Sequence, residues 1–211
     1  IVAMMQFNHY HHYTVDEHSI QCVAHLAAIE RGDEADSLPL TTDILRRGVN
    51  RRVLYLAMLL HDIGKGRAED HAILGARIAR RVCQRLRLPP AEVETVEWLV
   101  RHHLIMSDMA QKRDIGDPRT LRDFAKAVRS RDRLDLLTVL TVCDIRGVGP
   151  GVWNNWKAML LRQLHADTAH VLEAGLEEVN RIRHGSEART ALRRALEVRG
   201  WSTAAIRDEL R

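Results

Sequence analysis

Apolar positions recur along this chain at intervals of three and four residues, and no segment shows the convincing alternation that is typical of a strand. Residues 53–60 and 134–143 are almost wholly apolar, which predicts two helices that are buried on all sides. Helices with a single apolar face are predicted to begin near residues 15, 71, 90 and 118. The hydrophobic pattern therefore predicts an all-α fold.

Residues that start and stop helices divide the first half of the chain. Thr14 and Glu17 have the spacing of a capping box, and Gly32 follows the predicted first helix of residues 15–30. The polar connection after Gly32 contains a possible short helix near residues 42–47. We therefore expect short, well-delimited helices in this half.

The second half has one long helix and one segment without a clear period. Residues 104–116 are predicted to be irregular, and a long helix is predicted from Trp153 to about Arg183. Gly185 and Gly200 are expected to divide the remainder into two amphipathic helices, the second of which begins at Ser202. His165, His170 and His184 lie in this polar region, where we expect no special role for them.

At 211 residues the chain is long enough for one domain with a sizeable core. We expect a lead-in segment at residues 1–14, a core at residues 15–150 and a helical extension of the same domain at residues 151–211. The three histidines of the lead-in, at positions 9, 11 and 12, are expected to pack across the domain. Because the first residue is Ile, we expect the chain to be part of a longer protein.

The composition favours a cytoplasmic protein that binds neither membranes nor nucleic acid. Apolar residues make up 45% and charged residues 28% of the chain, and no run is apolar for the ~18 residues that a membrane span needs. The net charge of +4 comes from interspersed acids and bases, which is too weak to indicate nucleic acid. Cys22, Cys83 and Cys143 are odd in number and widely spaced, as in a protein with reduced cysteines.

The pair His61 and Asp62 ends the first apolar helix, where a polar pair is costly. Burying an unsatisfied polar group costs about 2–7 kcal/mol, and burying a charge costs more. A metal ion is the simplest partner for both side chains. Lys65 follows Gly64 and is expected at the mouth of the site, and Asp144 ends the second apolar helix in the same way as Asp62 ends the first.

Further histidines lie at helix ends or on apolar faces. His18 faces inward near the start of its predicted helix, His71 begins another, and His102 and His103 follow the stripe that Val96 and Val100 define. Imidazoles mixed with carboxylates suit Mn, Mg, Fe or Zn, so the ligand types leave open both the metal and whether one or two ions bind. The candidate ligands are His18, His61, Asp62, His71, His102, His103 and Asp144.

These residues carry a family resemblance. His18, His61-Asp62 and Asp144 match in order and spacing the H…HD…D pattern of the HD superfamily of metal-dependent phosphohydrolases, which are helical bundles. The extra histidines at 71, 102 and 103 resemble those of members that hold two metals. Residues 13–18, 61–67 and 104–107 resemble the HD domains of bifunctional PII uridylyltransferase/uridylyl-removing enzymes, and this resemblance extends from about residue 5 to past residue 156.

The resemblance implies a hydrolase of nitrogen regulation that removes UMP from a modified tyrosine of the PII signalling protein. His18, His61, Asp62 and Asp144 would then hold one divalent ion, Mn or Mg being favoured. Asp62 would bridge to a second ion held by the histidines at 71, 102 and 103, and Lys65 would bind the phosphate. This assignment makes Asp62 and Lys65 the catalytic residues. The nucleotidyltransferase and ACT domains of that family are not visible in this sequence.

Two other readings remain open from the sequence. The first is a different HD phosphohydrolase, acting on a free nucleotide or a cyclic dinucleotide, which an enclosing pocket would favour over a shallow site. The second is a non-catalytic interaction module that uses the basic face between Arg77 and Arg85 to bind an acidic partner.

Overall fold

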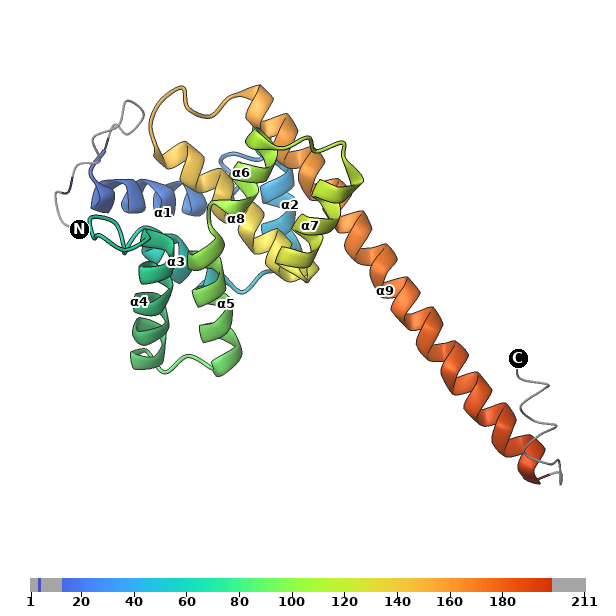
Figure 1. Ribbon diagram of the computed structural model, residues 1–211. Coiled ribbons are helices and arrows are strands. Elements are labelled where there is room, and N and C mark those ends of the chain that lie inside the picture. The colour runs from blue at the N-terminus through green and yellow to red at the C-terminus, as the bar shows by residue number, and fades with distance from the viewer. Residues whose placement is uncertain (1–3, 5–12, 199–211) are drawn as a thin grey trace. The chain divides into compact units, whose positions relative to one another are not determined.

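The computed structural model describes Met4 and residues 13–198, and these residues form helices and no strands (Figure 1). The all-α prediction is therefore confirmed. By its internal contacts the chain divides into one unit of residues 1–169 and another of residues 170–211. The bounds of the helices are α1 Val15–Arg31, α2 Pro39–Arg47, α3 Arg51–Leu60, α4 His71–Arg85, α5 Pro90–His102, α6 Ile105–Lys112, α7 Pro118–Val128, α8 Arg131–Gly147 and α9 Asn155–Val198.

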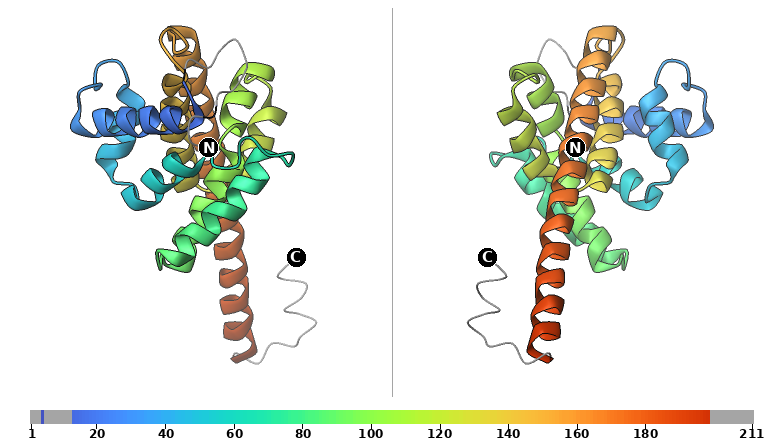
Figure 2. Two further views of the ribbon diagram at one scale, coloured as in Figure 1. Left: turned by 90° about the vertical axis from the view of Figure 1, so that its left-hand side faces the viewer. Right: turned by 90° about the vertical axis from the view of Figure 1, so that its right-hand side faces the viewer.

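Helix α8 is the centre of the first unit. It packs against α1, α2, α3, α5, α6 and α7, and every side chain from Leu134 to Cys143 is buried (Figures 1 and 2). Helices α4 and α5 pack against each other as a hairpin (Figure 1). The prediction of a helix that is buried on all sides is confirmed for residues 134–143. It is wrong for residues 53–60, because Leu59 in α3 is 47% exposed.

Side chains of loop residues fix the starts of three helices. Asp70 accepts hydrogen bonds from the backbone N–H groups of Ala72 and Ile73 and caps α4, so the predicted start at His71 is confirmed. Asp117 accepts from Arg119 N–H and caps α7. Ser130 does the same for α8. These bonds satisfy backbone donors that the first turn of a helix leaves unpaired.

Two local predictions are wrong. The Thr14 side chain makes no capping hydrogen bond, although α1 does begin at Val15 and end before Gly32, whose φ is +87°. Residues 104–116 are not irregular throughout, because they contain α6. That helix has no side-chain cap, and it is stabilised by packing: Met106 is fully buried, and its sulfur accepts a hydrogen bond from Thr138 of α8.

Helix α9 differs from the prediction in its length. It begins at Asn155 and continues through Gly185 to Val198, so the predicted division at Gly185 is wrong. A glycine inside a helix lowers its stability by about 0.5–1 kcal/mol, which the surrounding turns can offset. Gly200, Ser202 and the histidines at 9, 11 and 12 lie outside the described residues.

His165, near the start of α9, is not in a polar environment. It is 4% exposed, and its Nε2–H donates to Oδ1 of Asp135 in α8 across 2.6 Å. Arg131 donates to the same oxygen across 3.0 Å, and Arg47 lies 3.5 Å from the other. His165 therefore lies in the core as a hydrogen-bond partner of Asp135, and not on a polar surface.

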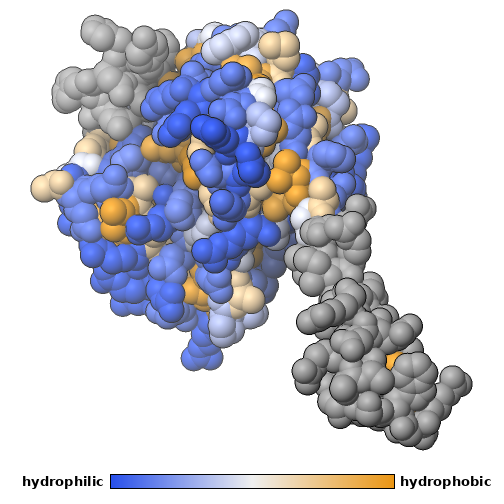
Figure 3. Space-filling view, turned by 45° about the vertical axis from the view of Figure 1, so that its right-hand side comes forward, coloured by the Kyte–Doolittle hydropathy of each residue, from blue (hydrophilic) through white to orange (hydrophobic). Residues whose placement is uncertain are grey.

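The face of the first unit that Figure 3 shows is mostly polar. Figure 3 shows hydrophilic side chains over most of the coloured face, with hydrophobic ones in small separate groups. Among the described residues, no helix combines the length and the apolar character that crossing a bilayer requires.

Candidate metal centre

Four of the predicted ligands converge from distant parts of the chain. His18 comes from α1, His61 and Asp62 follow α3, and Asp144 comes from α8. His18 Nε2 lies 3.2 Å from His61 Nε2 and 3.0 Å from Asp144 Oδ1, and His61 Nε2 lies 3.5 Å from that same oxygen. Oδ2 of Asp62 lies 3.6 Å from His18 Nε2 and 3.4 Å from His61 Nε2. The four side chains therefore form one compact donor group.

A second donor group lies on the other side of Asp62. The Oδ1 atom of Asp62 lies 3.6 Å from His103 Nε2 and 3.9 Å from His71 Nε2. Asp62 thus turns one oxygen toward His18 and His61 and the other toward His71 and His103. This is the placement that a carboxylate bridging two ions requires.

Two glycines allow the backbone to bring these ligands together. A Cβ on Gly64 would overlap the backbone carbonyl oxygen of His71 and lie 2.7 Å from the nitrogen of Gly75, so the loop after Asp62 lies directly on the first turn of α4. A Cβ on Gly147 would overlap the sulfur of Cys22 and lie 3.2 Å from Nδ1 of His18. Glycine at these positions permits the close approaches that place His71 beside Asp62 and α8 beside His18.

Backbone carbonyls set the tautomers of two histidines. Nδ1–H of His61 donates to the carbonyl of Met58 across 2.7 Å, and Nδ1–H of His103 donates to that of Val100 across 2.7 Å. When neutral, both rings therefore present an Nε2 lone pair to the carboxylates. A hydrogen bond that fixes the far nitrogen is the usual support of a metal-ligating histidine.

The ionisable groups are strongly coupled. Burial lowers the pKa of His61, but the negative charges of Asp62 and Asp144 outweigh burial and raise it to about 10. Burial and the charge of His61 lower the pKa of His103 to about 4. Burial raises the pKa of Asp62, but the charge of His61 outweighs it and the net shift is downward. Burial likewise raises the pKa of Asp144, but the charge of His61 and the hydrogen bond from His18 outweigh it and the net shift is downward. Both carboxylates thus stay ionised in this buried site and attract a cation.

Two polar atoms at the centre are buried without a hydrogen-bond partner among the described residues. They are Oδ1 of Asp62 and Nε2 of His71. An orphaned buried polar atom costs about 1–3 kcal/mol, and more when it is charged. A divalent cation between these atoms would satisfy both, so the residues fit a metal. The histidine and carboxylate donors agree with a metal cofactor but do not identify the element.

Lys65 lies at the edge of the first donor group. Its Nζ is 2.6 Å from Oδ2 of Asp62, and its side chain is 11% exposed. An ammonium group cannot ligate a metal while it is protonated. Lys65 therefore adds positive charge beside the carboxylate, near the predicted mouth.

His102 does not join the centre, although the sequence analysis includes it among the ligands. Its ring lies 5.2 Å from the ring of Trp98, and it is half-buried on the outer side of α5. Burial, followed by the charge of Arg101, lowers its pKa. Of the three expected histidines, only His71 and His103 lie beside Asp62.

Cys22 is a neighbour of the centre that the ligand assignment from sequence missed. Its sulfur lies 3.5 Å from Nε2 and 3.8 Å from Nδ1 of His18, so it sits over the imidazole ring. Burial raises its pKa well above the usual range of a thiol. The spacing of four residues from His18 on one helix is the signal that places it there. We interpret Cys22 as packing for His18.

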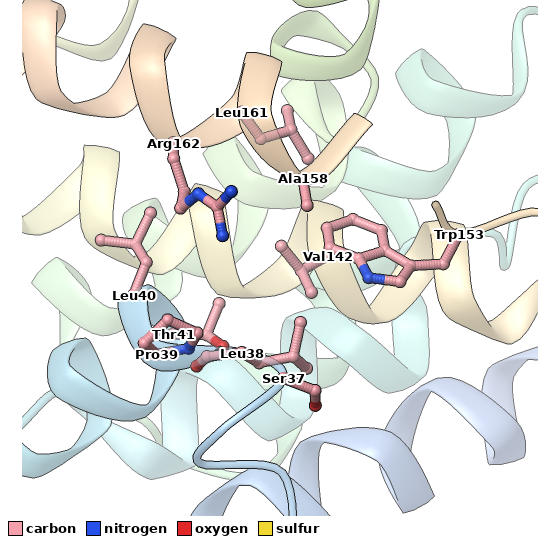
Figure 4. A pocket seen from close by; sticks show the side chains of 10 residues that line it. All are labelled: Ser37, Leu38, Pro39, Leu40, Thr41, Val142, Trp153, Ala158, Leu161 and Arg162. Carbon is pink, nitrogen blue, oxygen red and sulfur yellow. Dashed lines mark hydrogen bonds between the residues drawn. The ribbon is translucent and has the colours of Figure 1, made fainter. Parts of the chain in front are cut away.

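A small cavity elsewhere in the first unit is unrelated to this centre. It lies between the start of α2, Val142, Trp153 and the first turns of α9 (Figure 4). Its volume is about 20 Å³, which is room for about one water molecule. Its lining is mainly apolar, with Arg162 at one side (Figure 4). We therefore interpret it as a packing void.

Comparison with known proteins agrees with this geometry. The family model of the HD domain matches residues 15–145, from the start of α1 to one residue past Asp144. The chain is 68% identical over 210 residues to the bifunctional uridylyltransferase/uridylyl-removing enzyme of Cereibacter sphaeroides, and 67% identical over 210 residues to the enzyme of the same name from Ruegeria pomeroyi. The match covers 100% of this chain but only 22% and 23% of those relatives. This chain belongs to the HD domain family.

Proposed function

We propose that this domain is the uridylyl-removing part of a longer enzyme. In this proposal it hydrolyses the phosphodiester that joins UMP to a tyrosine of the PII signalling protein, and it releases UMP. The observation that carries the proposal is the bridging position of Asp62, whose two oxygens face two separate donor groups. The names and the high identity of the relatives support removal of a uridylyl group.

The chemistry of the site suits a phosphodiester. A divalent cation, when bound here, lowers the pKa of water toward 7 and neutralises charge on the phosphoryl oxygens. We propose His18, His61, Asp62 and Asp144 as ligands of one ion, and Asp62, His71 and His103 as ligands of a second. Mn and Mg are the favoured ions, and Fe and Zn are the alternatives. Tyrosine, with a pKa of about 10, leaves without a strong general acid.

Lys65 is proposed to bind a non-bridging oxygen of the phosphate. Its ammonium group is next to Asp62, so a phosphate placed across the two donor groups would come within its reach. A positive charge at that position stabilises the charge that develops during phosphoryl transfer. Asp62 and Lys65 are therefore the catalytic residues of the proposal.

The two other readings of the sequence are weaker. An enzyme for free nucleotides or cyclic dinucleotides would enclose its substrate, whereas His71, at the open side of this centre, is 29% exposed. An interaction module would use the basic face of α4, but Arg77 forms an ion pair with Glu69 and Arg80 one with Glu97. Part of the charge on that face is therefore neutralised within the domain.

The direct test is to incubate the purified chain with uridylylated PII and Mn²⁺ and to measure UMP. The expected result is release of one UMP per modified tyrosine, with none in the presence of a chelator. The Asp62→Asn variant is the matched control, because it keeps the shape of the side chain and removes the bridging charge. Hydrolysis of cyclic dinucleotides but not of uridylylated PII would overturn the proposal in favour of the second hydrolase.

A further inference from the structure

A surface groove begins beside the second donor group. It has a volume of about 570 Å³ and lies between the start of α4, the end of α5 and α6. The residues directly before and after His71 line it, and so do the residues directly before and after His103. None of the donor residues lines the groove, but it lies close to the side of the centre where His71 is 29% exposed.

The lining combines apolar surface with polar groups of both signs. Ile73 is 37% exposed and Leu104 is 41% exposed, so the groove offers apolar surface to a ligand. Arg101 and Arg113 supply hydrogen-bond donors, and Asp108 supplies an acceptor. A nucleoside has the matching chemistry, because its base has apolar faces and a polar edge and its ribose carries hydroxyl groups.

We propose that this groove binds the nucleoside half of the phosphodiester substrate, with the base against Ile73 and Leu104. This inference rests on the proposed function, because it assumes that the scissile phosphate lies across the two donor groups. The nucleoside then extends from the phosphate along α6, and the tyrosine side of the diester points away from the groove.

The groove is large enough for a nucleoside, because small-molecule sites typically measure about 300–1,000 Å³. A second cavity, of about 370 Å³, lies beside His25 and Arg146, near the Asp144 end of the centre. Asp144 is only 16% exposed, so the centre is less open there than at His71.

Two small diesters separate nucleoside binding from phosphate chemistry. Uridine 5′-(p-nitrophenyl phosphate) contains the nucleoside, and bis(p-nitrophenyl) phosphate does not, while both release the same aryl group. The test variant combines Leu104→Ala with Arg113→Ala. The matched control combines Leu86→Ala with Arg85→Ala, which lie exposed at the far end of α4.

The expected result is a rise of about 10-fold in KM for the uridine diester in the groove variant, with no change for the other diester. The control should keep both KM values. Equal changes in the KM values of the groove variant for both diesters would overturn the inference. Unchanged KM values for both diesters would also overturn it. A rise only for uridylylated PII would overturn it too, and would make the groove a protein-docking surface.

A binding measurement separates this inference from the proposed function. Saturation-transfer NMR on the intact chain should show contact with uridine itself, and the groove variant should lose that signal. A His25→Ala variant should keep the uridine signal. Loss of the signal in that variant would place the nucleoside in the second cavity and overturn the proposal. If the wild-type chain bound uridine but released no UMP from uridylylated PII, the proposed function would fail while the nucleoside site would stand.

Discussion

His102 and His103 are neighbours in sequence, but their side chains lie in different environments. Nε2 of His103 lies 3.6 Å from Oδ1 of Asp62, whereas the ring of His102 lies against Trp98. One residue corresponds to a rotation of about 100° around a helix axis, so adjacent side chains at the end of α5 diverge. Substitution of His103 therefore tests the second donor group, and substitution of the adjacent His102 is its control.

We expect His103→Ala to lose the second metal ion and His102→Ala to keep it. His103 supplies a lone pair to the second donor group, and His102 does not reach it. Metal content per chain, measured by mass spectrometry after saturation with Mn²⁺, should be about two for the His102 variant and about one for the His103 variant, as expected for a dinuclear site. Equal contents in the two variants would contradict this assignment.

The shared carboxylate predicts a graded series around the same centre. His71→Ala should lose the second ion, His61→Ala the first, and Asp62→Ala both, because Asp62 faces both groups. Circular dichroism checks that each variant keeps its helices. A wild-type chain that never binds more than one ion would make the site mononuclear, with His71 left as a phosphate contact.

Lys65→Ala should reduce kcat without removing metal. Lys65 pairs with Asp62 but is not part of either donor group. Loss of one group that stabilises transition-state charge costs about 10²–10³ in kcat. Steady-state kinetics and metal analysis of the same preparation check this, with Lys126→Ala, exposed in α7, as the control. Loss of metal from the Lys65 variant would make Lys65 a structural residue instead.

Gly64→Ala should damage the second donor group through the backbone. The added methyl group would overlap the carbonyl oxygen of His71, so the loop or the first turn of α4 must move. Forced overpacking costs about 1–3 kcal/mol of unfolding free energy. Denaturant unfolding and metal content measure the effect. Gly175→Ala, where a Cβ has open space, is the control and should leave the metal content unchanged.

The buried pair of Asp135 and His165 predicts a loss of stability in acid. Burial raises the pKa of Asp135. The hydrogen bond from His165 and the charge of Arg131 lower it by more, so the pKa lies below its ordinary value of 3.8. A carboxyl with a depressed folded pKa stabilises the fold above pH 3.8, and this contribution disappears as the pH falls through the folded pKa.

Asp135→Asn should therefore lower the unfolding free energy at neutral pH by about 1–3 kcal/mol, the cost of an unpaired buried partner. Urea unfolding of both proteins between pH 7 and pH 2 measures the difference. The two curves should converge at the acid end, where Asp135 is protonated in the wild type. A constant difference down to pH 2 would exclude this ionisation as its cause.

The sequence predicts the first donor group more completely than the second. His18, His61, Asp62 and Asp144 match the ordered H…HD…D pattern of the HD family, and the structure brings all four together. His103 carries a signal too, because it shares its face with Val96 and Val100. That spacing also suits core packing, and only the tertiary structure shows that this face turns toward Asp62.

Other features depend on contacts that periodicity does not contain. Helix α6 has neither a cap nor a long apolar stripe, and it is held by the burial of Met106 under α8. The role of His165 depends on Asp135, which is 30 residues away in the chain. Leu59 belongs to an apolar run, yet it is exposed because no described neighbour covers it. For α6 and His165 the deciding partner is remote in sequence, and for Leu59 such a partner is lacking among the described residues.

The hydrogen bond between His18 and Asp144 joins residues that are 126 positions apart. Closing so long a loop has an entropic cost that grows with its length, and the contact that closes it forms only when α1 has docked on α8. A nascent chain that has not yet released α8 from the ribosome therefore has no complete first donor group. If an ion binds there as proposed, its uptake would have to wait until nearly the whole HD domain has been synthesised.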